Sequence, residues 1–151
     1  MLEKYKKIVT VFCYIQENNK VLMLKKGEFY NAIGGKVEKG ESPYQAILRE
    51  TIEEAGIEIK PNYKGHISIE NFTNNQDWDC HVFTAKSYKG NLLEKSPEGE
   101  LVWIKKEDLL KINLWESDKQ FIPLVFEDKF FFMNMKFENQ KYKSNEVWFI
   151  P

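Results

Sequence analysis

Three carboxylates, Glu50, Glu53 and Glu54, lie close together in the chain. Residues three and four apart lie on the same side of an α-helix, so a helix here would bring these side chains together. Like charges at this spacing destabilise an exposed helix by about 0.2–0.5 kcal/mol per pair. Because Mg²⁺ and Mn²⁺ prefer oxygen ligands, whereas Zn²⁺ prefers histidine and cysteine, the cluster predicts a magnesium or manganese site. The alternative is an acidic face in contact with solvent, although the segment lacks the lysines that usually alternate in such a face.

The helix that must carry these carboxylates is predicted over residues 43–55. Ser42 is a favourable N-cap, Pro43 suits the first helical position, and Gly56 suits the position after the last turn. Residues at the helical period are expected to form its buried stripe: Tyr44, Leu48, Thr51, Ile52 and Ala55. On this interpretation all three glutamates lie opposite the stripe.

The remaining pattern predicts an α/β fold, with a mixed β-sheet flanked by helices. Runs rich in β-branched and aromatic residues predict strands at residues 7–15, 21–24, 57–59, 101–104, 130–137 and 147–150. Residues 66–70 and 78–88 are expected to form a hairpin across a polar turn at residues 73–76. Short helices are expected at residues 106–110 and 117–126. A loop is expected to hold four glycines: Gly27, Gly34, Gly35 and Gly40.

Length and composition restrict the class of protein. With 151 residues, of which 15% are aromatic, the chain is expected to be a single folded domain spanning residues 1–151. The 22 basic and 23 acidic residues give a net charge of −1, which argues against binding to duplex nucleic acid. No apolar run approaches the ~20 residues of a membrane span, and the N-terminus lacks a secretion signal pattern. Cys13 and Cys80 are expected to be buried free thiols in a reducing cytoplasm.

The segment from Gly35 to Ile57 resembles the Nudix box. The pattern of that box is G-x5-E-x7-R-E-hydrophobic-x-E-E-x-G-hydrophobic, and the chain matches its fixed positions with Gly35, Glu41, Arg49, Glu50, Glu53, Glu54 and Gly56. One departure is Thr51, where an aliphatic residue is usual, but its methyl group can still face a core. The resemblance implies a Nudix fold, which is an α/β/α sandwich with the box helix on one face of the sheet. It also implies hydrolysis of a diphosphate bond.

The resemblance further implies a site for Mg²⁺, or for Mn²⁺ in its place. Its ligands would be the carbonyl of Gly35 and the carboxylates of Glu50, Glu53, Glu54 and Glu98. Glu98 is chosen by its position before Trp103, and Glu100 in the same connector is its rival. The alternative for Glu98 is a solvated loop acid, and the alternative for Gly35 is an ordinary turn.

The bound cation would neutralise a polyphosphate and lower the pKa of the attacking water. Glu50 and Glu98 are both candidates for the base that takes the proton of that water. Arg49, one turn before Glu53, is expected to orient carboxylates. The phosphates would also be attracted by nearby lysines: Lys25, Lys26 and Lys36.

A longer resemblance, over nearly the whole chain, is to the MutT-type oxidised-purine nucleoside triphosphatases. It rests on Asn31 ahead of IGGKVEKGE, on DCHVF at residues 79–83, on LWESDKQFIPLVFEDKFFF at residues 114–132, and on MKFEN at residues 135–139. It implies that Asn31 and Asp118 hydrogen-bond a purine, that Trp115 stacks on the purine, and that three further side chains line the pocket: Ile69, Trp78 and Phe121.

Two departures from the mammalian-type enzymes concern this pocket. Ser117-Asp118 stands where those enzymes have two adjacent acids, and the loop between Lys26 and Asn31 is about four residues shorter. From the residues alone, Trp115 could instead be a core aromatic, and Asp118 could be an ordinary acid at a helix start.

Together these features predict a Mg²⁺-dependent nucleoside triphosphate pyrophosphohydrolase acting on 8-oxo-dGTP or related oxidised purine nucleotides. The resemblance implies that water attacks the β-phosphorus, which would release a monophosphate and pyrophosphate. The alternatives are another diphosphate substrate, such as ADP-ribose, a dinucleoside polyphosphate or a capped RNA end, and, ranked lower, a non-catalytic nucleotide-binding module. We expect a cytoplasmic monomer or weak homodimer that serves DNA repair by cleaning the nucleotide pool. His66 and His81 are expected to be lone structural histidines.

Overall fold

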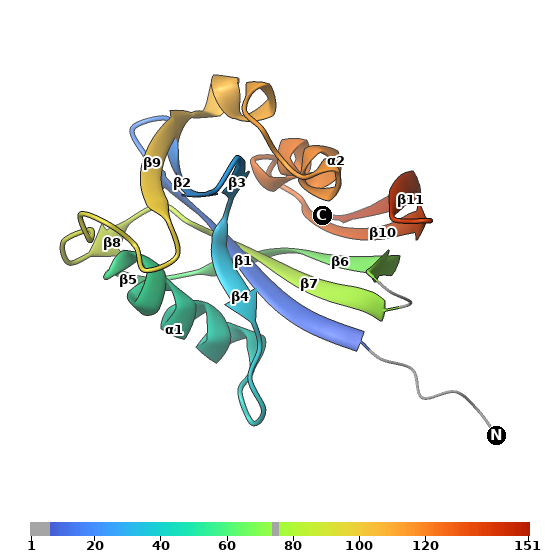
Figure 1. Ribbon diagram of the computed structural model, residues 1–151, viewed down its shortest axis with the longest axis horizontal. Coiled ribbons are helices and arrows are strands. Elements are labelled where there is room, and N and C mark those ends of the chain that lie inside the picture. The colour runs from blue at the N-terminus through green and yellow to red at the C-terminus, as the bar shows by residue number, and fades with distance from the viewer. Residues whose placement is uncertain (1–6, 74–75) are drawn as a thin grey trace.

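The computed structural model describes residues 7–73 and 76–151 and shows a large mixed sheet with helices on both faces (Figure 1). The strands of this sheet are β1 (Lys7–Glu17), β2 (Lys20–Lys26), β3 (Phe29–Asn31), β4 (Ile33–Lys36), β6 (Asn62–Thr73), β7 (Gln76–Ala85), β9 (Glu100–Lys105), β10 (Phe130–Glu138) and β11 (Lys141–Ile150). A separate pair consists of β5 (Glu58–Ile59) and β8 (Tyr88–Lys89). The helices are α1 (Pro43–Ala55), the 3₁₀ helix η1 (Lys106–Lys111) and α2 (Glu116–Val125).

The strands follow the order β11-β10-β6-β7-β1-β2-β3, with β4 paired to β1 and β9 paired to β2. β1 runs parallel to β7, and β10 runs parallel to β6. The other pairs in this sheet are antiparallel, among them the predicted hairpin of β6 and β7. The predicted mixed sheet is therefore confirmed.

The two faces of the sheet have separate cores, because side chains alternate along each strand. Val11 and Cys13 of β1 belong to the same buried cluster as Ile47 of α1. Tyr14, next along β1, points to the other face, where its ring lies 6.4 Å from that of Phe121 in α2. The helices α1 and α2 thus cover opposite faces, which confirms the predicted α/β/α sandwich.

Helix α1 begins and ends where the sequence predicts. The Ser42 side chain accepts a hydrogen bond from the backbone N–H of Gln45 at 3.1 Å, and the Gln45 side chain accepts one from the N–H of Ser42 at 2.9 Å. This reciprocal pair is a capping box. Gly56 ends the helix in the left-handed region with φ 74, a conformation that favours glycine.

The buried side of α1 differs from the predicted stripe. Tyr44 and Ile52 are 52% and 53% exposed, whereas Ala46 and Ile47 are fully buried. Glu54 is also buried, so the prediction that all three glutamates lie opposite the core is wrong. The reason is a contact with a backbone N–H of β4, which the helical period alone cannot reveal.

The segment predicted to be one loop contains two strands, β3 and β4. Glycine weakens a strand pattern, and so Gly34 and Gly35 concealed β4. Gly34 stands opposite Phe12 in the pairing of β4 with β1, and a Cβ at Gly34 would collide with the backbone carbonyl of Val11. The close approach of β4 to β1 therefore requires glycine at this position.

The other elements agree with the prediction in position but differ in extent. The second strand of the hairpin ends at Ala85, and Tyr88 belongs to the separate strand β8. Residues 74–75 of the predicted turn lie outside the described residues. Cys13 and Cys80 are buried free thiols, as predicted. Within the described ranges, no helix has the length and apolar character needed to cross a membrane.

Candidate functional site

The three glutamates of α1 occupy different environments. Glu53 is exposed, Glu50 is largely buried, and Glu54 is almost fully buried. One carboxylate oxygen of Glu54 accepts the N–H of Gly34 at 2.9 Å, and the other lies 3.7 Å from Nζ of Lys26. Burial raises the pKa of Glu54 to about 7 and also raises the pKa of Glu50. Such buried carboxylates are stabilised as anions by a neighbouring cation.

Arg49 connects these acids to the loop before the helix. Its guanidinium donates to both carboxylate oxygens of Glu41, at 2.8 and 3.0 Å. Its Nη1 also donates to Glu50 at 2.9 Å and to Glu53 at 3.2 Å, and Nη2 donates to the carbonyl of Lys36 at 3.1 Å. The bonds from Arg49 lower the pKa of Glu41 to about 2. Arg49 therefore fixes the positions of three carboxylates.

Gly35 lies directly against Glu50. A Cβ atom at Gly35 would lie 2.5 Å from Oε1 and 3.0 Å from Oε2 of Glu50. Gly35 pairs with Val11 inside strand β4, so the alternative of an ordinary turn is wrong. The absence of a side chain lets the carboxylate of Glu50 lie beside the backbone of β4.

Glu98 reaches the same group of acids through Lys26. Nζ of Lys26 lies 3.7 Å from a carboxylate oxygen of Glu54 and 4.0 Å from one of Glu98. The charge of Glu98 is close enough to contribute to the raised pKa of Glu54. Glu100, its rival, begins β9 and pairs with Lys25 in the sheet. The geometry thus associates Glu98 with the acids of α1.

The predicted ligands form a donor set made entirely of oxygen atoms, which fits Mg²⁺. A cradle that a Cβ at Gly35 would fill and the buried carboxylate of Glu54 both favour a cation here. Among the described residues, no three of these carboxylates have oxygen atoms that all lie within 4.8 Å of one another. Among the described residues, the three-ligand group whose atoms all lie within 4.8 Å of one another is elsewhere, at His66, Asp79 and His81.

A cavity of about 310 Å³ lies on the other face of the sheet, beside α2. Six residues predicted to bind the substrate line it: Asn31, Ile69, Trp78, Trp115, Asp118 and Phe121. The sequence interpretation missed seven further lining residues: Phe12, Tyr14, Ala32, Phe72, Thr73, Cys80 and Ser117. The alternation along β1 signals that Phe12 and Tyr14 share a face, but it does not show that this face is hollow.

Trp115 is held at the mouth of this cavity. Its ring stacks on Phe29, with centroids 3.9 Å apart and an interplanar angle of 9°. Its Nε1 donates to Oδ1 of Asn31 at 3.0 Å, and Nδ2 of Asn31 donates to the carbonyl of Phe29 at 3.3 Å. Trp115 is 46% exposed, so the alternative of a core aromatic is wrong. Phe29 was missed because it lies in the short strand concealed among glycines.

Asp118 lies in the first turn of α2, in the wall of the cavity. Burial raises the pKa of its carboxyl group to about 7, against the opposing effect of a hydrogen bond with Ser117. Near neutral pH this group can therefore donate as well as accept hydrogen bonds. Lys25 and Lys36 lie outside the cavity: Nζ of Lys25 is 5.7 Å from the centroid of the Tyr30 ring, and Lys36 is exposed.

His66 and His81 are not lone histidines. They face each other across the pair of β6 and β7, with ring centroids 4.9 Å apart, and both lie beside Asp79. Burial lowers the pKa of His81, and the neighbouring His66 lowers it further. The strand register brings these residues together, and the sequence pattern does not give that register.

Known proteins resemble this chain over most of its length. Residues 5–125 match the NUDIX domain family. The oxidized purine nucleoside triphosphate hydrolase of Mus musculus is 31% identical over 139 residues, which cover 89% of this chain and 88% of that protein. The protein of the same name from Danio rerio is 31% identical over 150 residues, covering 93% and 96% of the two chains. The crystal structure of a mutator MutT protein from Bacillus halodurans superposes with a TM-score of 0.84 at 29% identity, covering 93% of this chain and 97% of that one.

Proposed function

This chain belongs to the Nudix family and is a Nudix hydrolase, and we propose that it hydrolyses oxidised purine nucleoside triphosphates, such as 8-oxo-dGTP, to a monophosphate and pyrophosphate. The names of the mouse and zebrafish relatives support this class of substrate. The cavity beside α2 supports a purine because six of its thirteen lining residues are aromatic and the lining also holds an amide and a carboxyl group.

The proposal rests on the short chain segment, residues 31–35, that joins the cavity to the carboxylates. Asn31 lines the cavity, and Gly34 and Gly35 contact Glu54 and Glu50. Four residues of extended chain span no more than about 14 Å. A nucleotide whose base occupies the cavity can therefore extend its phosphates toward the carboxylates.

We propose that the carboxylates of Glu50, Glu53, Glu54 and Glu98 and the carbonyl of Gly35 hold Mg²⁺. When bound, the cation supplies charge neutralisation for the polyphosphate and acidifies a water molecule. Arg49 keeps the carboxylates oriented through its bonds to Glu41, Glu50 and Glu53. Lys26, which lies between Glu54 and Glu98, balances part of their charge.

Glu50 is the proposed general base. Its carboxylate lies against Gly35, and burial raises its pKa above the ordinary value, which makes the carboxylate a stronger base. Arg49 donates to Oε1 of Glu50, which leaves Oε2 to accept a proton. As the water oxygen bonds to the β-phosphorus, its proton passes to Oε2. The bond from the β-phosphorus to the oxygen that bridges the α- and β-phosphorus atoms breaks, and the monophosphate leaves with that oxygen.

Three side chains are proposed to recognise the base. Phe29 covers one face of Trp115, so the purine would stack on the other face. Asp118 would accept hydrogen bonds from the N–H edge of a guanine-like base, and Asn31 would bond the opposite edge. Ser117 beside Asp118 carries no charge, so base selectivity would depend on a single carboxyl group.

The test is kcat/KM with Mg²⁺ for 8-oxo-dGTP against dGTP. We expect a preference for 8-oxo-dGTP, and equal values would reject the assignment to oxidised purines. A wider panel should include ADP-ribose, a dinucleoside polyphosphate and capped RNA, since preference for one of these would identify a different substrate. Binding without turnover of any substrate would identify a nucleotide-binding module.

The metal assignment has its own test. Glu53→Gln and Glu54→Gln should each abolish turnover and leave the fold intact, as judged by circular dichroism. Full activity in both variants would contradict the proposed ligands.

We also propose that the chain acts as a single domain, as a cytoplasmic monomer or weak homodimer that cleans the nucleotide pool. Its two buried free thiols suit a reducing compartment. Sedimentation of the purified protein would measure its oligomeric state.

A further inference from the structure

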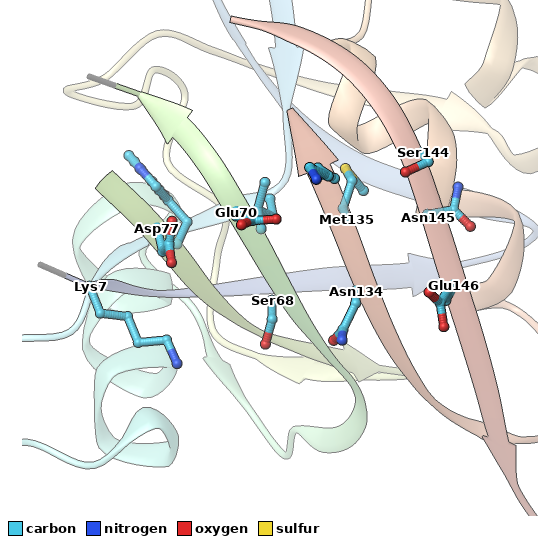
Figure 2. A pocket seen from close by; sticks show the side chains of 12 residues that line it. Lys7, Ser68, Glu70, Asp77, Asn134, Met135, Ser144, Asn145 and Glu146 are labelled. Atoms are coloured by element: carbon cyan, nitrogen blue, oxygen red, sulfur yellow. The ribbon is translucent and has the colours of Figure 1, made fainter. Parts of the chain in front are cut away.

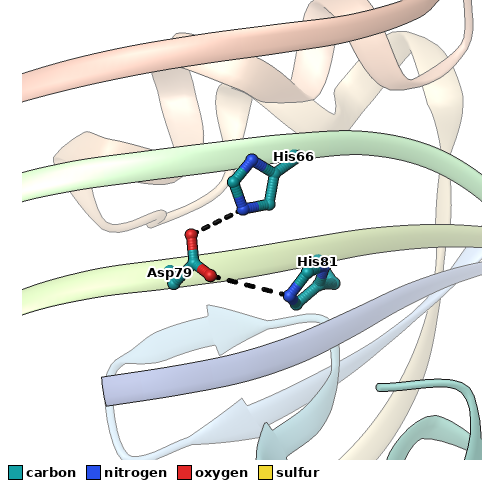
Figure 3. A group of neighbouring side chains, drawn as sticks. All are labelled: His66, Asp79 and His81. Carbon is teal, nitrogen blue, oxygen red and sulfur yellow. Dashed lines mark ion pairs between the residues drawn. The ribbon is translucent and has the colours of Figure 1, made fainter. Parts of the chain in front are cut away.

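Three side chains capable of binding a metal meet on β6 and β7: His66, Asp79 and His81 (Figure 3). His66 stands directly opposite His81 in the antiparallel pair, and Asp79 precedes His81 by two residues, so all three point to the same face of the sheet. Nε2 of His66 lies 2.5 Å from Oδ1 of Asp79, and Nε2 of His81 lies 3.7 Å from Oδ2. Two imidazoles thus direct nitrogen atoms toward one carboxylate.

The carboxylate of Asp79 is incompletely satisfied. Its Oδ1 is buried and makes no hydrogen bond among the described residues, although Nε2 of His66 lies beside it. Nζ of Lys7 is 3.9 Å away, too far for a hydrogen bond. A buried anionic oxygen without hydrogen bonds is unfavourable unless a cation lies against it.

A hydrogen bond with Tyr63 fixes the orientation of the His81 ring. The hydroxyl of Tyr63 and Nδ1 of His81 lie 2.7 Å apart in a hydrogen bond. When Nδ1 carries the proton and Tyr63 accepts it, the lone pair of the imidazole is on Nε2, which faces Asp79. Histidine ligands of metals are typically oriented by such a bond from the other ring nitrogen.

The cluster is separate from the carboxylates of α1. It shares no residue with them, and its ligands come from strands near the middle of the sheet. Ser68, which pairs with Asp79 in the sheet, lines a polar hollow of about 550 Å³ over β6, β7, β10 and β11 (Figure 2). His66, Asp79 and His81 remain 24%, 16% and 18% exposed, so a small ion can reach them.

We propose that His66, Asp79 and His81 form a second metal site, which binds a divalent transition metal of the Zn²⁺ class. Two imidazoles and one carboxylate suit such an ion and are a poor match for Mg²⁺, which takes oxygen ligands. Three protein ligands leave one position of a tetrahedral ion for water.

One of the two observed distances between ligand atoms is close to the value that Zn²⁺ needs, and the other is too short. Ligands about 2.1 Å from a tetrahedral ion are about 3.4 Å apart. The 3.7 Å separation of His81 and Asp79 meets this value, and the 2.5 Å separation of His66 and Asp79 must open by about 1 Å. Opening it requires a rotation of the Asp79 side chain.

The test exploits the fact that the chain has only two histidines. Tag-free, ¹⁵N-labelled protein is titrated with Zn²⁺ in excess Mg²⁺, and the imidazole nitrogens are followed by NMR. We expect the Nε2 signals of both rings to shift together and to saturate at one Zn²⁺ per chain. Unchanged imidazole signals would overturn the proposal, since the three side chains would then contact one another without a metal ion.

Calorimetry on variants gives a second readout. The double variant His66→Gln, His81→Gln should lose this binding, and Tyr63→Phe should weaken it by about tenfold, the usual effect of removing a partner behind a ligand. Glu53→Gln is the matched control and should bind Zn²⁺ as the wild type does. Loss of binding in Glu53→Gln, with retention in the double variant, would place the ion at α1 and reject the second site.

Discussion

At the scale of single residues, Gly35 has no room for a side chain because the carboxylate of Glu50 occupies the space. Gly35→Ala should therefore displace that carboxylate by about 1 Å to restore a normal contact distance. Such a displacement of a proposed catalytic group should lower kcat by about 10²-fold. The free energy of unfolding should change little, because the displaced group is the flexible end of a side chain. Steady-state kinetics and urea denaturation of the same sample measure both quantities.

Gly40 provides the matched control for Gly35. It lies in the loop between β4 and α1 with φ +83, and a Cβ there would meet nothing within 4 Å. Gly40→Ala should lower the free energy of unfolding by about 1 kcal/mol through backbone strain and leave kcat unchanged. An equal loss of kcat in both variants would show that the contact between Gly35 and Glu50 has no part in turnover.

Asp118 should give the protein a specific dependence of stability on pH. Its pKa is about 7 in the folded chain, above the ordinary value of 3.8, so the folded state binds a proton that the unfolded state releases. The stabilisation is complete below about pH 4 and is lost as the pH rises through about 7. Relative to Asp118→Asn, the wild type should lose up to about 4 kcal/mol over that range. Urea denaturation at several pH values measures the difference, and parallel curves would contradict the raised pKa.

At the scale of elements, the packing of α1 rests on a different stripe from the one its sequence suggests. Ile47 is fully buried against β1, whereas Ile52 is 53% exposed. Ile47→Ala should lower the free energy of unfolding by about 2–5 kcal/mol because it leaves a cavity. Ile52→Ala, the matched change on the same helix, should lower it by less than about 1 kcal/mol. Equal effects in urea denaturation would support the predicted stripe over the observed one.

The error on α1 shows where prediction from sequence stops. The ends of the helix were predictable because Ser42, Pro43 and Gly56 act through local backbone geometry. Its buried face was not, because burial of Glu54 depends on Gly34 of another strand. Strand β4 was missed for a related reason, since its glycines serve close pairing with β1 and carry no strand signal of their own.

The candidate site likewise contains residues that the sequence predicted and residues that only the folded structure brings together. The carboxylate box and the cavity residues Asn31, Trp115 and Asp118 were found because their spacing resembles a known family. Phe29 and the group of His66 and Asp79 were missed, since stacking and strand register bring them together only in the folded chain.

At the scale of the whole molecule, the sheet separates the proposed recognition of the base from the proposed chemistry. Trp115 contacts Phe29 and Asn31 on the α2 side, and Arg49 contacts the acids of α1 on the other side. These described contacts have no residue in common. The two functions should therefore contribute independently to catalysis, joined only by the substrate that spans them.

A double-mutant cycle tests this independence. Trp115→Ala should raise KM for 8-oxo-dGTP with little change in kcat, because it removes stacking that is equal in the ground and transition states. Arg49→Lys should lower kcat by about tenfold or more, since lysine cannot make the paired bonds of arginine to Glu41. In the double variant the two effects on kcat/KM should add to within about 0.5 kcal/mol. A larger coupling energy would mean that the position of the base controls the alignment of the carboxylates, and the separation by the sheet would then be structural but not functional.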